Sequence, residues 1–184
     1  MGIRAVLMLS LCVAMPAFGA EVAGVKLEDK TSELVLNGAG VRTRVIFNVY
    51  VIGLYLPEKK TDAAAVLQLA GPKRVAIHML RNVGAEQFSE ALADGIRANH
   101  SEAESQALEP RVKELAATMA EMKEAKKGMA ITLDWTGSAT QLAIDGKPAG
   151  RPIPGEDFYR ALLRIWLGEK PVQEDLKKAL LGQG

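Results

Sequence analysis

The chain has 184 residues, with 23 Lys or Arg against 22 Asp or Glu, which gives a formal net charge of +1. A balance this close to neutral removes the electrostatic reason to propose binding to nucleic acid or to an anionic membrane, since both need many uncompensated cations. The single cysteine, Cys12, excludes a disulfide, and two histidines, His78 and His100, are too few for an imidazole-rich metal site. We therefore expect no metal and no cofactor.

Residues 1–20 have the layout of a secretory signal peptide. Arg4 precedes a short apolar run, Pro16 breaks it, and small residues follow at Ala17, Gly19 and Ala20. We expect cleavage near Gly19 or Ala20, which leaves one domain at residues 21–184. Removing Arg4 leaves 22 basic and 22 acidic residues, and no later apolar run is long enough to span a bilayer. The sequence thus predicts an exported, periplasmic protein without an integral membrane segment, with secretion as the alternative.

The first half of this domain reads as strands. Both alternating sets of positions between Arg44 and Leu56 are apolar, which is typical of a central strand covered on two faces. Gly38-Ala39-Gly40 is expected to interrupt the β-structure with a turn before that strand. The other expected elements are strands at 22–27, 32–36 and 74–80 and a short helix at 63–69.

The second half is predicted to be mainly helical, with one hairpin. Ser101 and Glu104 have the spacing of a capping box, and Asp145-Gly146 is a favoured two-residue hairpin turn. Apolar residues at helical spacing run through 88–96 and 112–122, strands are expected at 129–135 and 140–144, and helices at 156–167 and 173–181. Strands first, then helices and a hairpin, indicate an α+β fold around an antiparallel sheet.

Common catalytic motifs do not occur, so few polar candidates remain. There is no phosphate-binding glycine-lysine loop, no Gly-x-Ser-x-Gly turn and no His-Glu-x-x-His motif. Arg42 stands beside the glycine pair, and in an apolar cavity its guanidinium would need an anionic partner. Tyr50 would add a hydroxyl from the same face if the strand ran unbroken between them. The alternative is an exposed strand-end arginine and a core tyrosine, and Arg81 is open to the same two interpretations.

Three separated blocks carry a resemblance to a known family. They are Leu36 to Arg42, Asn48 to Leu56, and Trp166 to Val172 leading into Asp175 to Leu180. In this order they resemble the chalcone isomerase-like family, most closely its bacterial exported branch. The resemblance implies a large antiparallel sheet with a layer of helices on one face and a ligand cleft between them.

The resemblance also implies two functions. The plant enzymes of the family close a chalcone into a flavanone, and its non-catalytic relatives hold a fatty-acid carboxylate with an arginine and a tyrosine. Arg42 matches the arginine of both branches, and Tyr50 matches the fatty-acid binders. The isomerase tyrosine falls at or near Gln87 and the isomerase asparagine near Asp94, which argues against flavonoid cyclisation, because a polarising donor is lost and an aspartate would repel a phenolate.

The leading hypothesis is therefore a non-catalytic binder of a small amphipathic acid or lipid-like ligand. Its polar side chains would be Arg42, Tyr50, Arg81, Gln87 and Asp94, and its apolar cleft would be lined by Ile46, Ile52, Phe88, Leu92 and Phe158. One alternative is an isomerase, an intramolecular lyase acting on an enone or phenolic compound. The other is a structural or partner-binding protein of the cell envelope whose cleft is filled by its own side chains. The oligomeric state is left open.

Overall fold

A seven-stranded antiparallel sheet organises the computed structural model, which describes residues 18–183. The strand order is β11-β10-β9-β6-β5-β4-β3. These strands are β3 (Lys30–Thr31), β4 (Leu34–Arg44), β5 (Phe47–Leu56), β6 (Lys73–Met79), β9 (Ala130–Trp135), β10 (Ala139–Ile144) and β11 (Lys147–Pro154). Two small two-stranded sheets are formed by β1 (Phe18–Val22) with β2 (Val25–Glu28) and by β7 (Val83–Gly84) with β8 (Glu124–Ala125).

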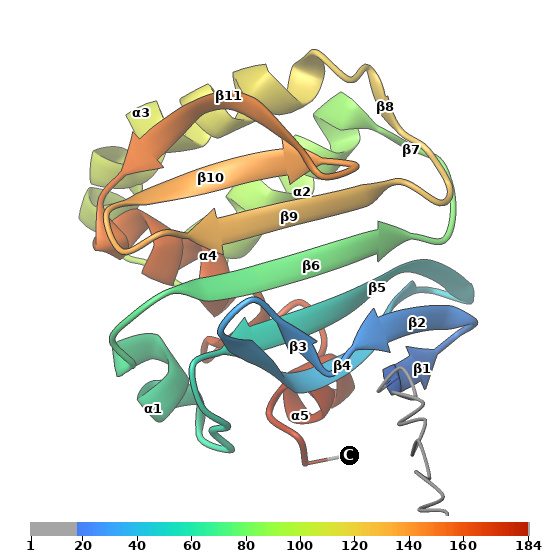
Figure 1. Ribbon diagram of the computed structural model, residues 1–184. Coiled ribbons are helices and arrows are strands. Elements are labelled where there is room, and N and C mark those ends of the chain that lie inside the picture. Colours follow the sequence, from blue (N-terminus) through green and yellow to red (C-terminus); the bar gives the residue numbers. More distant parts are fainter. Residues whose placement is uncertain (1–17, 184) are drawn as a thin grey trace, which may run out of the picture.

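Helices cover one face of the large sheet (Figure 1). This layer consists of α2 (Ala85–Ala98), α3 (Glu102–Ala120) and α4 (Glu156–Leu167), while α5 (Glu174–Leu180) lies against β4. The short α1 (Ala63–Gln68) lies in the connection from β5 to β6. One antiparallel sheet with a helical layer confirms the predicted α+β class. Among the described residues, no helix is both long and apolar enough to cross a bilayer.

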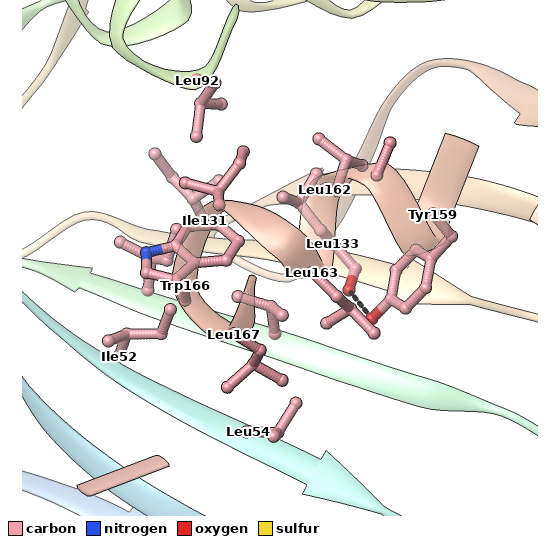
Figure 2. Packing of buried hydrophobic residues seen from close by; sticks show 14 of the residues in the cluster. Ile52, Leu54, Leu92, Ile131, Leu133, Tyr159, Leu162, Leu163, Trp166 and Leu167 are labelled. Atoms are coloured by element: carbon pink, nitrogen blue, oxygen red, sulfur yellow. Dashed lines mark hydrogen bonds between the residues drawn. The ribbon is translucent and has the colours of Figure 1, made fainter. Parts of the chain in front are cut away.

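The main core lies between α4 and the sheet. Phe158, Tyr159 and Trp166 of α4 are each at most 1% exposed. Figure 2 shows Trp166 among Ile52 of β5, Ile131 of β9 and Leu92 of α2, and Tyr159 donating a hydrogen bond to the Leu133 carbonyl at 3.1 Å. A second, smaller cluster packs on the opposite face of the sheet and joins it to β1 and β2. The sheet is thus covered on both faces around β5, as the doubly apolar pattern predicted.

The predicted break at Gly38-Ala39-Gly40 and the single strand from Arg44 to Leu56 are both wrong. β4 continues through the glycines as one strand, with a bulge in its pairing between Leu36 and Gly38, and the chain reverses at Val45 and Ile46 before β5 begins. The glycines permit close packing instead of a turn. A Cβ on Gly38 would lie 2.6 Å from the Leu180 carbonyl oxygen and closer still to that of Ala179, so α5 can approach β4 only because the side chain is absent.

Other sequence predictions have mixed outcomes. The strand expected at 22–27 is instead the hairpin of β1 and β2, which turns at Ala23 and Gly24. The capping box is confirmed, because the Ser101 hydroxyl accepts from the Glu104 amide at 3.3 Å and the Glu104 carboxylate accepts from the Ser101 amide at 2.8 Å. The Asp145-Gly146 turn is confirmed between β10 and β11.

The predicted signal peptide lies almost entirely outside the described residues. Its last three residues, Phe18 to Ala20, belong to β1. The expected cleavage point therefore falls inside this strand, and the prediction of export remains a prediction.

Candidate functional site

Arg42 and Tyr50 are neighbours across two adjacent strands. The register of β4 against β5 pairs Arg42 with Tyr50, and directly paired residues of antiparallel strands share one face of the sheet. Tyr50 belongs to the core cluster on the helical side. The sequence placed both residues on one face of one strand; the structure places them on one face of a hairpin, because the chain reverses between them.

The Tyr50 hydroxyl lies at the edge of the core beneath α4. The side chain is 6% exposed, and its oxygen accepts a hydrogen bond of 3.0 Å from Nε1 of Trp166. Its ring lies 6.2 Å from that of Phe88, between centroids. Burial raises the pKa of Tyr50, an effect that the Trp166 hydrogen bond and the charge of Arg42 oppose. The phenol is therefore protonated at neutral pH and can donate a hydrogen bond.

The Arg42 guanidinium is half-buried and is held by uncharged groups. Its Nη1 donates to the Thr43 carbonyl at 2.5 Å and to Oε1 of Gln173 at 3.3 Å. Within residues 18–183 no carboxylate forms an ion pair with Arg42. A half-buried guanidinium without an anionic partner is suited to binding an anion, because a carboxylate matches its donor geometry.

Gln173 is a site residue that the sequence reasoning missed. It is the N-cap residue of α5, and its side chain accepts from the Thr43 amide at 2.9 Å and donates to the Val41 carbonyl at 3.3 Å. It therefore both fixes the end of β4 and orients Arg42. The one available signal is its position between the two parts of the third resemblance block, just after Val172, since no periodicity marks this glutamine.

Arg81, Gln87 and Asp94 lie apart from this pair. Arg81 is exposed, and its guanidinium carbon lies 4.6 Å above the centre of the Phe47 ring. Gln87 and Asp94 are both exposed and are seven residues apart on α2, whose inner face carries Phe88, and Asp94 pairs with Arg97 at 2.5 Å. The structure thus brings Arg42 and Tyr50 together and leaves the other three predicted residues on the surface.

The residues predicted to line a cleft are mostly packed against one another. Ile52, Phe88, Leu92 and Phe158 are buried in the core cluster, whereas Ile46 is 80% exposed at the turn after β4. Two cavities, of about 230 and about 410 Å³, lie in the helical layer, and neither is lined by Arg42 or Tyr50. Trp166 contacts the Tyr50 hydroxyl, and Phe88 lies beside the Tyr50 ring.

The smaller cavity lies between α3 and α4 and has charges of both signs. Arg160 and Arg164 line it together with His100, and so do Glu104 and Asp157. Arg164 lies 3.2 Å from Nε2 of His100, while Nδ1 of His100 lies 2.8 Å from the Ile96 carbonyl, which assigns the imidazole proton to Nδ1. In the part of the chain that the structure describes, no group of three His, Cys, Asp or Glu side chains is placed to hold a metal ion.

The larger cavity lies between α2 and α3. Ala93 and Ile96 of α2 and Val112 and Ala116 of α3 give it an apolar floor. Three glutamates, Glu90, Glu102 and Glu109, line it together with two cations, Arg97 and Lys113, and Lys113 pairs with Glu109 at 2.9 Å, so its lining has no cation excess to attract a carboxylate ligand.

Comparison with known proteins agrees with the architecture. No curated protein matches this chain in sequence. Among solved structures, the chain is similar to a fatty-acid binding protein of Arabidopsis thaliana, with a TM-score of 0.67 and 12% identity over 86% of this chain and 92% of that one. At this identity the likeness establishes the fold. A sequence profile described as chalcone isomerase-like matches residues 19–182, which is nearly the whole chain. With the antiparallel sheet, the helical layer and this match in hand, we conclude that the chain belongs to the chalcone isomerase-like family.

Proposed function

We propose that this protein is an exported, non-catalytic binder of a small amphipathic carboxylate such as a fatty acid. The observation that carries the proposal is the pairing of Arg42 with Tyr50 on the helical face of the sheet, with a guanidinium that lacks an anionic partner among the described residues. The similar Arabidopsis protein is a fatty-acid binding protein, which supports the choice of ligand class.

The polar end of the ligand would be held by two kinds of donor. Nη1 of Arg42 makes both of the hydrogen bonds that this guanidinium forms within residues 18–183, so Nε and Nη2 are left for a carboxylate. The Tyr50 hydroxyl accepts from Trp166 and retains its own proton as a donor. A charge-assisted pair of this kind is about twice as strong as a neutral hydrogen bond.

The apolar end of the ligand would require side chains to move. Trp166 and Phe88 fill the space next to Tyr50, so an acyl chain enters only by displacing one of these rings. Half-buried Met122 and Met129 pack against the same core. Methionine side chains adapt to irregular shapes at little cost, which makes this part of the core suited to admitting a chain.

Trp166 supplies a direct test. In a Trp135→Phe background it is the remaining tryptophan. Titration of the delipidated protein with oleate below its critical micelle concentration should then give a saturable change in Trp166 emission. We expect Arg42→Gln to weaken this binding at least ten-fold, as loss of a charge-assisted hydrogen bond does. Arg151→Gln, whose side chain is 89% exposed, should leave it unchanged. No saturable change, or equal affinities in both variants, would contradict the proposal.

The isomerase alternative has less support from the geometry. Gln87 and Asp94 stand where the family's tyrosine and asparagine are expected, and both are exposed on α2, away from Tyr50. Turnover of a chalcone by the purified protein that disappears in Arg42→Ala would favour the isomerase over the binder.

One observation favours a second candidate, a partner-binding protein of the cell envelope. The space beside Tyr50 is filled by the chain's own Phe88 and Trp166, and the two cavities described above lie elsewhere. In this case Arg42 serves only to join β4 to Gln173. Arg42→Gln would then lower the free energy of unfolding by about 1 kcal/mol, as loss of a hydrogen bond does, while oleate would bind to neither form.

Export is part of the proposal and has its own test. Cleavage after Gly19 would retain the β1 residues Ala20 to Val22, which pair with Leu27, Lys26 and Val25 of β2. Mass spectrometry of the protein released from the periplasm of its host should find an N-terminus at Ala20 or Glu21. Recovery of a chain that still begins at Met1 in the cytoplasmic fraction would contradict export.

A further inference from the structure

The turn between β4 and β5 presents three large apolar side chains to solvent. Val45 is 89% exposed, Ile46 80% and Phe47 53%, and these are the exposed large hydrophobic residues of the described chain. Single exposed apolar residues are common on protein surfaces, but three consecutive ones at the tip of a hairpin form a protruding apolar wedge. We call Val45, Ile46 and Phe47 the apolar tip.

Folding stability does not explain the residues in this turn. Arg44 pairs with Phe47, so Val45 and Ile46 form a two-residue loop, and Val45 has a φ of +58°. Such loops favour Asn-Gly and similar pairs, and a β-branched residue at positive φ is a genuine outlier. The corresponding turns at Ala23-Gly24 and Asp145-Gly146 both contain glycine. A strained turn that is also apolar indicates selection for a contact made by these side chains.

Basic residues lie at the same end of the sheet as the apolar tip. The β6–β7 connection lies at this end of the sheet because the Leu80 amide donates to the Val49 carbonyl at 2.9 Å, and the segment before β9 lies there because the Gly128 amide donates to the Met79 carbonyl at 2.8 Å. Segments 42–48, 80–84 and 123–129 together carry six cations and one carboxylate, Glu124. The cations are Arg42, Arg44, Arg81, Lys123, Lys126 and Lys127.

These cations are available to an anionic surface. All except Arg42 are exposed, and none of the six forms a salt bridge within residues 18–183. Arg81 lies over the Phe47 ring, so charge and apolar tip are in contact. The overall charge of +1 hides this asymmetry. The argument from net charge against an anionic membrane therefore does not hold for this end of the molecule, since the field that a surface meets depends on where the charges lie.

We propose that the apolar tip inserts into the interfacial region of a bilayer that contains anionic phospholipids, with the surrounding cations on the lipid headgroups. An apolar wedge with a basic rim fits such a surface on both counts, since membrane binding grows with buried apolar area and with attraction to anionic lipid. Each Lys or Arg near an anionic surface raises the partition coefficient about five-fold. This inference is independent of the proposed ligand, although it would bring Arg42 to the lipid surface.

The turn allows a test that does not weaken the fold. The double variant Val45→Gly, Ile46→Asn removes the apolar pair and puts glycine at the position whose φ is +58°, so we expect an unchanged or higher melting temperature. Flotation of the full chain with phosphatidylcholine vesicles containing about 30 mol% phosphatidylglycerol should show the variant binding at least ten-fold more weakly than the parent. Lys126→Gln with Lys127→Gln should weaken binding about twenty-five-fold, and pure phosphatidylcholine should bind the parent weakly.

A probe at the apolar tip separates its contribution from that of the apolar N-terminal segment. In a Cys12→Ser background, an environment-sensitive fluorophore on Ile46→Cys should shift to the blue on adding the anionic vesicles. The same fluorophore on Ser138→Cys, in the exposed turn at the opposite end of β9, should not. Equal spectra at position 46 with and without vesicles would overturn the proposal. Unchanged flotation of the double variant would also overturn it. A dimer in solution that dissociates in this variant would assign the apolar tip to a protein contact instead.

Discussion

Nε1 of Trp166 donates a hydrogen bond to the hydroxyl of Tyr50 across 3.0 Å, and both side chains are buried. This bond joins the last turn of α4 to the first half of β5, 116 residues earlier in the chain. It positions the same hydroxyl that is proposed to meet a ligand. Its strength can therefore be measured both as a contribution to stability and as the barrier that a ligand must overcome.

Removal of either partner should destabilise the protein. Trp166→Phe leaves a space and loses the indole donor, and we expect the free energy of unfolding to fall by about 2 kcal/mol. Tyr50→Phe leaves the indole N–H without an acceptor, at a cost of about 1–2 kcal/mol. Urea unfolding of the parent, both single variants and the double variant gives the coupling energy, which we expect to be about 1 kcal/mol. Strictly additive losses would mean that the hydrogen bond contributes nothing.

Gly38→Ala should disrupt the contact between α5 and β4. The new Cβ would overlap the carbonyl oxygens of Ala179 and Leu180, which are backbone atoms and cannot rotate away. We expect a loss of at least about 2 kcal/mol in urea unfolding, because overpacking forces the helix to shift. Gly84→Ala is a matched control, since a Cβ there meets nothing within 4 Å and the glycine has no positive φ. Equal stabilities of the two variants would contradict this account of the glycine pair.

Lys73→Met should stabilise the protein. Lys73 is 2% exposed at the start of β6, and its ammonium lies 3.3 Å from the Gly71 carbonyl and 3.9 Å from Glu156. Replacing such a poorly paired buried cation by an apolar side chain is often stabilising, and we expect a gain of about 1 kcal/mol at neutral pH. Lys59→Met, at an exposed position, should change stability little by the same measurement. A loss of stability in Lys73→Met would show that the ammonium is well compensated.

Lys73 also predicts how the stability of the protein changes in alkaline solution. Burial lowers the pKa of Lys73, and the charge of Glu156 opposes this. Between the lowered folded pKa and the ordinary value of 10.5, the unfolded chain holds more protons than the folded one, so stability from this group rises with pH. Thermal unfolding at increasing pH should therefore narrow the gap between the parent and Lys73→Met. A gap that stays constant up to that ordinary value would contradict the shift.

The carboxylate of Asp157, between α3 and α4, predicts how stability changes in acid. Arg111 donates two hydrogen bonds of 2.7 Å to Asp157, and this contact lowers the pKa of Asp157. The contribution to stability is complete above the ordinary pKa of 3.8 and is lost as the pH falls through the lowered folded value. Because the Asp157 side chain is 63% exposed, Asp157→Asn should cost less than about 1 kcal/mol at neutral pH. The difference from the parent should disappear in strong acid.

Local sequence determined much of the secondary structure. The capping box at Ser101, the turn at Asp145-Gly146 and the bounds of helix α4 depend on residues within a few positions of one another, so they could be predicted. The identity of Arg42 and Tyr50 as a pair also came from the sequence, through a resemblance between short blocks.

Tertiary structure decided which residues lie beside that pair and which lie away from it. Gly38 and Gly40 read as a turn because nothing local reveals that α5, about 140 residues later, packs against them. Val45 and Ile46 read as strand because two β-branched residues rarely form a hairpin loop, and Gln87 and Asp94 read as site residues because resemblance does not fix which face of a helix they occupy. The net charge of +1 was correct as a sum, yet only the fold brings six cations to the end of the sheet that carries the apolar tip, and electrostatic attraction depends on distance and not on the total.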